Sequence, residues 1–173
     1  LMSNQSNVFI LDPDHTYVSF EYDHFWFSFQ NSRFDKVSGE IEIDFKNETG
    51  SISIQIDTRS ISTGSDLFNS HIQGQEFFDT KKYPKATFVS DEIEFEYGKI
   101  VAVNGVLTIK DICEQITLEL VHFEHGKHPI SGKECCGANA VSVVSRSDFA
   151  MGKYAPQISD DIVIKISIEA SKE

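Results

Sequence analysis

Long apolar runs are absent from this chain of 173 residues. No stretch approaches the ~20 consecutive apolar residues that a helix needs to cross a bilayer, so we expect no transmembrane segment. The opening residues, LMSNQSNVF, also lack the basic and apolar regions of a secretory signal. These absences favour a cytoplasmic location for the chain as given.

Positive charge is also scarce. Lysine and arginine together number 15, against 27 aspartates and glutamates, which leaves a net charge of −12. A protein with this balance repels anionic polymers instead of attracting them. We therefore expect no nucleic-acid partner.

Cysteine is limited to Cys113, Cys135 and Cys136. The number is odd, and two adjacent cysteines are poorly placed to form a disulfide with each other. This usage suits a reducing compartment better than a disulfide framework. A bond from Cys113 to either of the other two stays open at this point.

Phenylalanine, by contrast, is abundant: the chain has 14, beside a single tryptophan. So many large rings must either pack a core or line a cavity. The length suits one domain, and there are no repeats, low-complexity segments or linkers. We place this domain at residues 8–171, after a disordered tail at residues 1–7.

Apolar and polar residues alternate along most of the chain, as in IEIDF and SISIQI. Period-two patterning in short segments separated by turns predicts antiparallel strands with one buried face. About eight such strands can form a sandwich or close into a barrel, and the pattern alone does not decide between them. The segments are residues 17–22, 37–45, 52–56, 93–97, 101–109, 116–120, 140–147 and 161–170.

The stretch FNSHIQGQEFFDTKKYPKATF, residues 68–88, interrupts this alternation. Ser65 and Asp66 offer a helix N-cap, and Gly74 marks a helix end, so we predict a short helix over residues 66–76. Pro84 ends the loop, and strand pairing resumes at Ala86. A helix and aromatic loop at this place would cover one end of a barrel.

Several motifs resemble the YceI-like family of lipocalin-like, polyisoprenoid-binding proteins. The most specific are DTRSIST, residues 57–63, and SHIQGQEFFDTKKYPKATF, residues 70–88. LDPDHTYVSFEYDHF (11–25), VNGVLTIKDICEQITL (103–118) and SRSDFAMG (145–152) follow the same order as in the family. The resemblance implies an all-β fold, a single extended antiparallel eight-stranded lipocalin-like barrel with a short helix between strands.

The resemblance further implies an elongated apolar cavity, often in a homodimer, that binds, stores or transports a polyisoprenoid, an isoprenoid quinone or a related lipid. It implies no enzymatic activity and no cofactor other than this lipid ligand. Many family members are periplasmic or secreted, which is the alternative to a cytoplasmic location. The chain departs from the family at Phe68-Asn69, at residues 110–115 and at Phe149-Ala150, which bears on headgroup preference.

We predict a ligand site made of the aromatic residues together with one histidine and one arginine; a solid core of packed rings is the alternative. In HFWFSF, residues 24–29, apolar residues fall on both faces. Either the strand bulges there, or one set of rings lies outside the barrel in a dimer contact. The predicted ligand-binding residues are Phe20, Tyr22, Phe25, Phe27, Phe34, His71, Phe77, Phe78, Tyr83, Phe88, Arg146 and Phe149.

Two other functions compete with lipid binding. The first is a β-sandwich interaction module without a ligand. The second is a metal-dependent enzyme that uses His122, His125 and His128, which we place in a loop because Gly126, Pro129 and Gly132 surround them. The histidine spacing fits neither a helix face nor a strand face, and the chain has no Gly-x-Ser-x-Gly, His-Glu-x-x-His or phosphate loop. We therefore predict neither a native metal site nor catalysis.

Overall fold

The computed structural model describes residues 7–173. Most of the predicted N-terminal tail, residues 1–6, lies outside the described residues. Within the described range the chain is built mainly of strands: β1 (Val8–Leu11), β2 (Tyr17–His24), β3 (Ser28–Phe34), β4 (Val37–Asp44), β5 (Thr49–Asp57), β6 (Ile61–Ser62), β7 (Lys85–Glu96), β8 (Lys99–Ile109), β9 (Ile112–Lys127), β10 (Glu134–Ser145) and β11 (Asp161–Lys172). One short helix, α1 (Asp66–Ile72), and two 3-10 turns, η1 (Thr58–Ser60) and η2 (Arg146–Phe149), complete the elements of this range.

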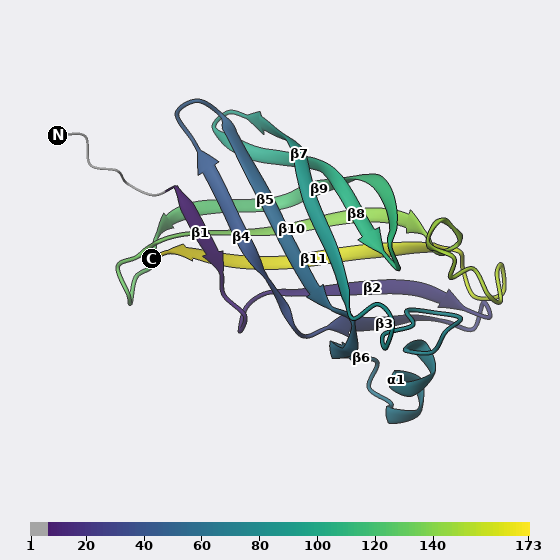
Figure 1. Cartoon of the computed structure of the whole chain (residues 1–173). Coiled ribbons are helices and arrows are strands. Elements are labelled where there is room, and N and C mark those ends of the chain that lie inside the picture. Colours follow the sequence, from purple (N-terminus) through teal and green to yellow (C-terminus); the bar gives the residue numbers. More distant parts are fainter. Residues whose placement is uncertain (1–6) are drawn as a thin grey trace.

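The strands close into a barrel (Figure 1). The order around it is β1, β4, β5, β7, β8, β9, β10 and β11, and β11 pairs back onto β1. β11 also pairs with β2, and β2 with β3, so β1 and β2 lie end to end along β11. The predicted eight-stranded antiparallel barrel is confirmed, and the β-sandwich alternative is wrong.

Period-two alternation places the apolar side chains inside this barrel. On β11, for example, Ile162, Ile166 and Ala170 are buried, and the charged Lys165 and Glu169 are exposed. Successive side chains of a strand point to opposite faces, so an apolar-polar repeat has its apolar face inward and its polar face outward. This is why the sequence pattern is sufficient to build the wall.

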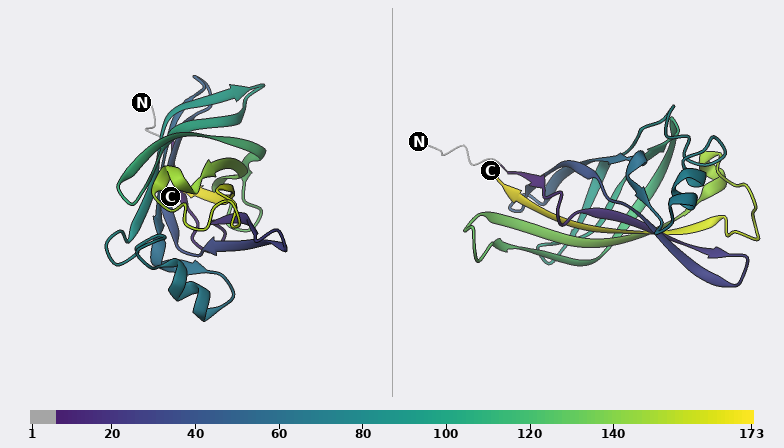
Figure 2. Two further views of the ribbon diagram at one scale, coloured as in Figure 1. Left: turned by 90° about the vertical axis from the view of Figure 1, so that its right-hand side faces the viewer. Right: turned by 90° about the horizontal axis from the view of Figure 1, so that it is seen from below.

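Helix α1 lies beside one end of the barrel (Figure 2). The Ser65 hydroxyl caps it by accepting from the Phe68 N–H at 3.3 Å, as the sequence predicts. The helix ends at Ile72, earlier than the predicted residue 76, because the chain turns at Gly74, whose N–H donates to the His71 carbonyl at 3.1 Å. In the part of the chain that is described, no helix combines the length and apolarity needed to span a membrane.

The HFWFSF segment is the tip of the β2–β3 hairpin. β2 ends at His24, and the chain reverses over Phe25 and Trp26, whose φ angles are 52° and 59°. The prediction of a bulged strand is wrong here. The alternative, with rings outside the barrel, is what the structure shows, since Trp26, Phe27 and Phe29 are exposed.

Candidate ligand-binding cavity

A cavity of about 390 Å³ occupies one half of the barrel. We call this half the hollow end; it carries the β2–β3 hairpin, α1 and η2, opposite the chain termini (Figure 1). The volume lies within the roughly 300–1,000 Å³ typical of small-molecule sites. Its wall consists mainly of hydrocarbon from eight strands, including Val18, Phe20, Phe34, Ile56, Ala86, Phe88, Leu107, Ile109, Ile116, Val144, Ile162 and Ile164.

The other half, which we call the packed end, holds a void of only about 40 Å³. Its interior is filled by side chains such as Ile41, Ile43 and Phe123. Ile54, Leu118 and Ile166 line both voids and so mark the boundary between the two ends. The family resemblance implies an elongated cavity, whereas in the structure the large cavity is confined to one half of the barrel.

The segment after α1 closes the side of the cavity with an aromatic side chain. The Phe78 ring stands edge-on to Phe34, with centroids 5.2 Å apart, and lies 6.1 Å from the Phe20 ring. Phe77 contacts the imidazole of His71 at 5.1 Å and also lines the cavity. The predicted helix and aromatic loop thus lie at the hollow end, but they close the side of the cavity, whereas the sequence predicts a cover over the end of the barrel.

The structure brings ten of the twelve predicted site residues into the wall of this one cavity. Phe27 is not among them, because it lies at the hairpin tip with 90% of its surface exposed. Tyr83 lies outside the wall as well: its carbonyl accepts from the Thr58 hydroxyl at 2.7 Å. Ligand contact by the other ten stays a prediction.

Several other cavity residues are not among the predicted ones. Gln30 and Asn31 on β3, and Tyr154 and Ile158 in the η2–β11 loop, also line the cavity. The isoleucines of β11 could have been found from their alternation. The loop residues carry no such signal, because a tertiary contact brings them to the cavity.

Arg146 makes the contact that brings this loop to the cavity. Its buried guanidinium donates to the carbonyls of Met151, Lys153, Ile158 and Ser159, at 2.8–3.0 Å for the last three. Burial lowers the pKa of this guanidinium, an effect opposed by the Asp160 carboxylate. A planar group with five N–H donors can hold several carbonyls at once. Arg146 therefore fixes the η2–β11 loop.

A second link joins this loop to the segment after α1. The Lys153 ammonium donates to the Glu76 carboxylate, and this bond raises the pKa of Lys153.

Ala150 stands in the left-handed conformation, with φ 56° and ψ 36°. Glycine adopts this conformation without strain, whereas an alanine at this position is strained.

Ser32 is an exception to the satisfied polar groups of this region. Its side chain is buried, and within the described residues its hydroxyl is the one buried side-chain oxygen or nitrogen without a hydrogen-bond partner. Such groups are uncommon in folded proteins and cost free energy. The hollow end thus retains an unpaired polar group beside its hydrocarbon wall.

The three histidines of residues 122–128 do not form a site. The loop prediction is wrong for His122 and His125, because β9 continues to Lys127. His125 stacks on Phe45, with centroids 4.2 Å apart, and its Nε2 lies 2.6 Å from the Glu134 carboxylate. The His128 ring accepts the Ile130 and Ser131 N–H groups. His125 and His128 have separate partners, and in the described residues none of the three histidines belongs to a group close enough to hold a metal ion, so the geometry does not favour the metal-dependent enzyme.

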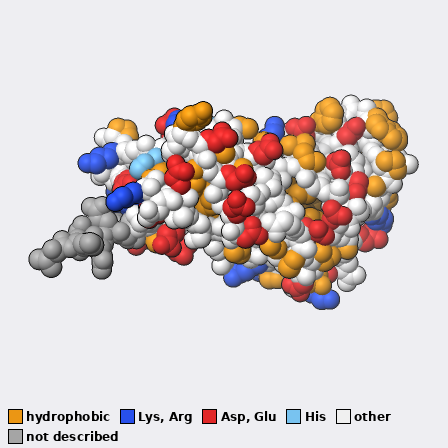
Figure 3. All heavy atoms as spheres, turned by 90° about the horizontal axis from the view of Figure 1, so that it is seen from above, with side chains coloured by type: hydrophobic (Ala, Val, Ile, Leu, Met, Phe, Trp, Pro, Cys, Tyr) orange, Lys and Arg blue, Asp and Glu red, His pale blue; other side chains and the backbone are white. Residues whose placement is uncertain are grey.

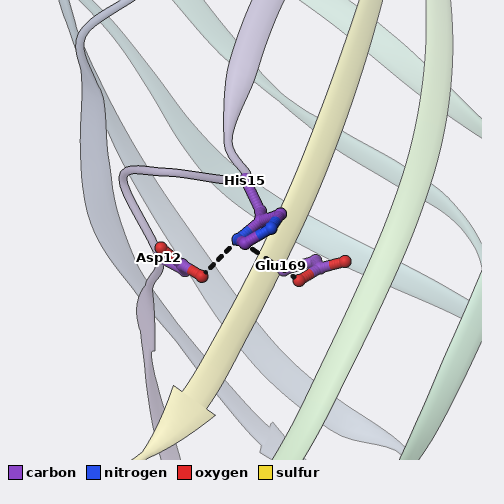
Figure 4. A group of neighbouring side chains, drawn as sticks. All are labelled: Asp12, His15 and Glu169. Carbon is purple, nitrogen blue, oxygen red and sulfur yellow. Dashed lines mark hydrogen bonds and ion pairs between the residues drawn. The ribbon is translucent and has the colours of Figure 1, made fainter.

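Asp12, His15 and Glu169 are the one group of three such side chains, in the described chain, close enough to hold a metal ion (Figure 4). His15 Nδ1 lies 2.7 Å from the Asp12 carboxylate and 3.8 Å from that of Glu169. The bond to Asp12 raises the pKa of His15 and lowers that of Asp12. We read the group as a link that holds the turn between β1 and β2 against β11.

The cysteines are all unpaired. Cys136 is buried in the packed end, and burial raises the pKa of its thiol to about 12. Cys113 lies at the start of β9 near the hollow end, and Cys135 at the start of β10 near the other. This separation removes the open alternative of a disulfide from Cys113.

Sequence comparison identifies the family. A model of the YceI-like domain matches residues 9–170. The chain belongs to the YceI-like family. This YceI-like chain is 30% identical to a UPF0312 protein of Pseudomonas putida over 163 residues, which are 94% of this chain and 84% of the relative.

Solved structures of YceI-like and related proteins share the fold. BcnA of Burkholderia cenocepacia superposes with a TM-score of 0.79 at 27% identity, covering 92% of this chain and 98% of BcnA. A polyisoprenoid binding domain from Saccharophagus degradans gives a TM-score of 0.72 at 16% identity, covering 98% and 100% of the two chains. The second likeness concerns the fold alone.

Proposed function

We propose that this protein binds a long apolar amphiphile in the hollow end of its barrel, and that it stores or transports this lipid without chemical change. A polyisoprenoid or an isoprenoid quinone is the ligand class. The observation that carries the proposal is the cavity of about 390 Å³ with its hydrocarbon wall. The description of the Saccharophagus degradans domain, which shares the fold, supports the choice of ligand class.

The energetics require no polar contact. Burying lipid contributes ~0.8 kcal/mol per methylene, so ten methylenes contribute roughly 8 kcal/mol. This corresponds to about micromolar binding before the ordering of the chain is subtracted. A predominantly apolar wall is therefore sufficient for a carrier.

Extraction of the purified protein with organic solvent, followed by mass spectrometry, tests the proposal directly. We expect a long-chain lipid in near-stoichiometric amount. After removal of this lipid, the protein should take up a fluorescent apolar probe that a polyprenol or a quinone displaces. Absence of both lipid and probe uptake would contradict the proposal.

A matched pair of variants locates the binding. Ile164→Trp places a large ring in the cavity, whereas Val143→Trp adds the same ring to an exposed position on β10. We expect the first variant to lose most probe uptake and the second to keep it. Equal uptake by both would place the probe elsewhere. Light scattering of the same samples measures the predicted homodimer.

A further inference from the structure

Six large exposed apolar side chains lie at the hollow end, beside the mouth of the cavity. Figure 3 shows acidic side chains spread over the barrel wall and apolar side chains at the end away from the termini. Phe25 and Phe68 also line the cavity, so the group is continuous with its interior. We call this group the apolar rim; it consists of Phe25, Trp26, Phe27, Phe29, Leu67 and Phe68.

The backbone of the hairpin tip makes this exposure unusual. Phe25 and Trp26 both have positive φ, and the Phe27 N–H donates to the His24 carbonyl at 3.0 Å. A β-turn whose two central residues both have positive φ favours Asn and Gly at those positions, because bulky side chains are strained at positive φ. The chain thus keeps two large rings where a small polar pair would be more stable. Such strain points to a function of the rings.

Charge indicates which partner the rim fits. Residues 24–32 contain no aspartate, glutamate, lysine or arginine, although the whole chain carries 42 such residues. An uncharged aromatic surface suits the boundary between water and lipid, where tryptophan and other aromatic rings gather. The acidic remainder of the protein disfavours anionic membranes.

We propose that the apolar rim docks on the surface of a zwitterionic lipid bilayer, so that the cavity mouth faces the membrane. This inference rests on the proposed function, because a lipid that occupies the cavity has a bilayer as its alternative environment. Docking brings Trp26 and Phe27 into the interface and keeps the lipid chain out of water during its transfer.

Trp26 is the one tryptophan of the chain, so its fluorescence reports docking without a label. With phosphatidylcholine vesicles we expect a blue shift of its emission and co-sedimentation of the protein. Added salt should change this binding little, and added phosphatidylserine should weaken it. An unchanged emission spectrum and no co-sedimentation would overturn the proposal.

Two double variants distinguish vesicle binding through the apolar rim from nonspecific binding by any exposed apolar side chain. Trp26→Gly with Phe27→Ser removes rings that do not line the cavity and gives the turn a residue that tolerates positive φ. We expect it to fold, to keep probe uptake and to bind vesicles at least about tenfold more weakly. Tyr97→Ser with Ile130→Ser removes two exposed apolar side chains from turns of the packed end. This control should bind vesicles like the wild type, and an equal loss would overturn the proposal.

The remaining outcomes separate this inference from its rival and from the proposed function. A vesicle-free dimer with Trp26 already blue-shifted, and no vesicle binding, would mean that a second copy covers the rim, and it would overturn membrane docking. Probe uptake without vesicle binding would overturn docking alone. Vesicle binding without probe uptake would contradict the carrier function and leave the rim's affinity for the bilayer intact.

Discussion

The hollow end and the packed end of the barrel are built from the same strands but end differently. β8, β9, β10 and β11 run through both, and apolar side chains of these strands face inward at both ends. At the packed end, β1, β4 and β5 add Phe9, Ile43 and Ile52 to fill the centre. At the hollow end, β3 and the segment around α1 complete the wall of the barrel. They leave its centre open. An identical strand pattern can therefore produce either a core or a cavity.

The two ends are also closed by different chemistry. At the packed end, the Glu134 carboxylate lies 2.6 Å from His125 Nε2 and 2.8 Å from the Lys172 ammonium. At the hollow end, Arg146 holds a loop, and Phe78 closes the side. The first closure is a compact ionic network, and the second is assembled from loops. Four predictions test this contrast.

The largest effect concerns deletion of side chains. Ile43→Ala, where the side chain is 1% exposed, should lower the free energy of unfolding by about 4 kcal/mol, because it creates a new void in packed surroundings. Ile164→Ala, at the cavity wall, should lower it by about 2 kcal/mol, because that side chain already borders empty space. Urea denaturation of the lipid-free protein measures both. Equal losses would mean that the hollow end is as tightly packed as the other.

Addition of side-chain volume reverses the test. Ala140→Leu at the packed end should lower the free energy of unfolding by about 2 kcal/mol through overpacking. Ala86→Leu projects into the cavity, and we expect a loss below about 1 kcal/mol together with weaker probe uptake. Denaturation and a probe titration give the two readouts. A severe loss of stability in the Ala86 variant would show that no room exists there.

Ser32 gives a smaller effect of opposite sign. Ser32→Ala removes a buried hydroxyl without a protein partner, so the lipid-free protein should gain about 1 kcal/mol in its free energy of unfolding. Thr58→Val is the control, because the Thr58 hydroxyl donates to the Tyr83 carbonyl at 2.7 Å and its loss should destabilise by about 1 kcal/mol. Thermal and urea denaturation measure both. Destabilisation by Ser32→Ala would reveal a hydrogen bond at that site.

The smallest effect depends on pH. The hydrogen bond from Lys172, followed by that from His125, holds the pKa of Glu134 below its ordinary value of 4.5. A depressed carboxyl pKa contributes stability above the unfolded-state pKa, and this contribution is lost as pH falls through the folded-state pKa. Glu134→Gln should thus lower the free energy of unfolding by under about 1 kcal/mol at pH 7, since the pair is partly exposed.

Below pH 4.5 the difference between Glu134→Gln and the wild type should shrink toward zero. Denaturation curves across pH 3–7 measure it. Glu119→Gln, at an exposed position on β9, is the matched control. If both variants gave the same pH profile, the effect would not come from the interactions of Glu134 with His125 and Lys172.

Much of the wall could be predicted from the sequence, because the alternation of β5, β8 and β11 depends only on neighbouring residues. The N-cap at Ser65 followed from local chemistry in the same way. The β2–β3 turn could not be found, since rings occupy both faces of HFWFSF and hide its reversal. His125 was misplaced because glycine and proline nearby are ordinary turn signals, whereas its stacking on Phe45 is a tertiary contact.

The candidate site was less predictable than the wall. Phe20, Phe34 and Phe78 would show the same pattern in a filled core, so their sequence cannot report the empty volume beside them. The role of Arg146 was also hidden, because its four carbonyl partners are main-chain atoms of a loop without a recognisable motif. Only the difference in cavity volume between the two ends distinguishes a ligand-binding barrel from a barrel with a solid core.

One consequence concerns the free edge of β3. Over Ser28–Ser32 this strand pairs with β2, and in the described part of the chain its other edge meets a strand only at Arg33 and Phe34, through β6. The main-chain ladder is therefore interrupted along that seam, and side chains such as Phe78 bridge it. Parting the seam breaks no ladder bond, so a flexible chain has a lateral route into the molecule as well as an axial one.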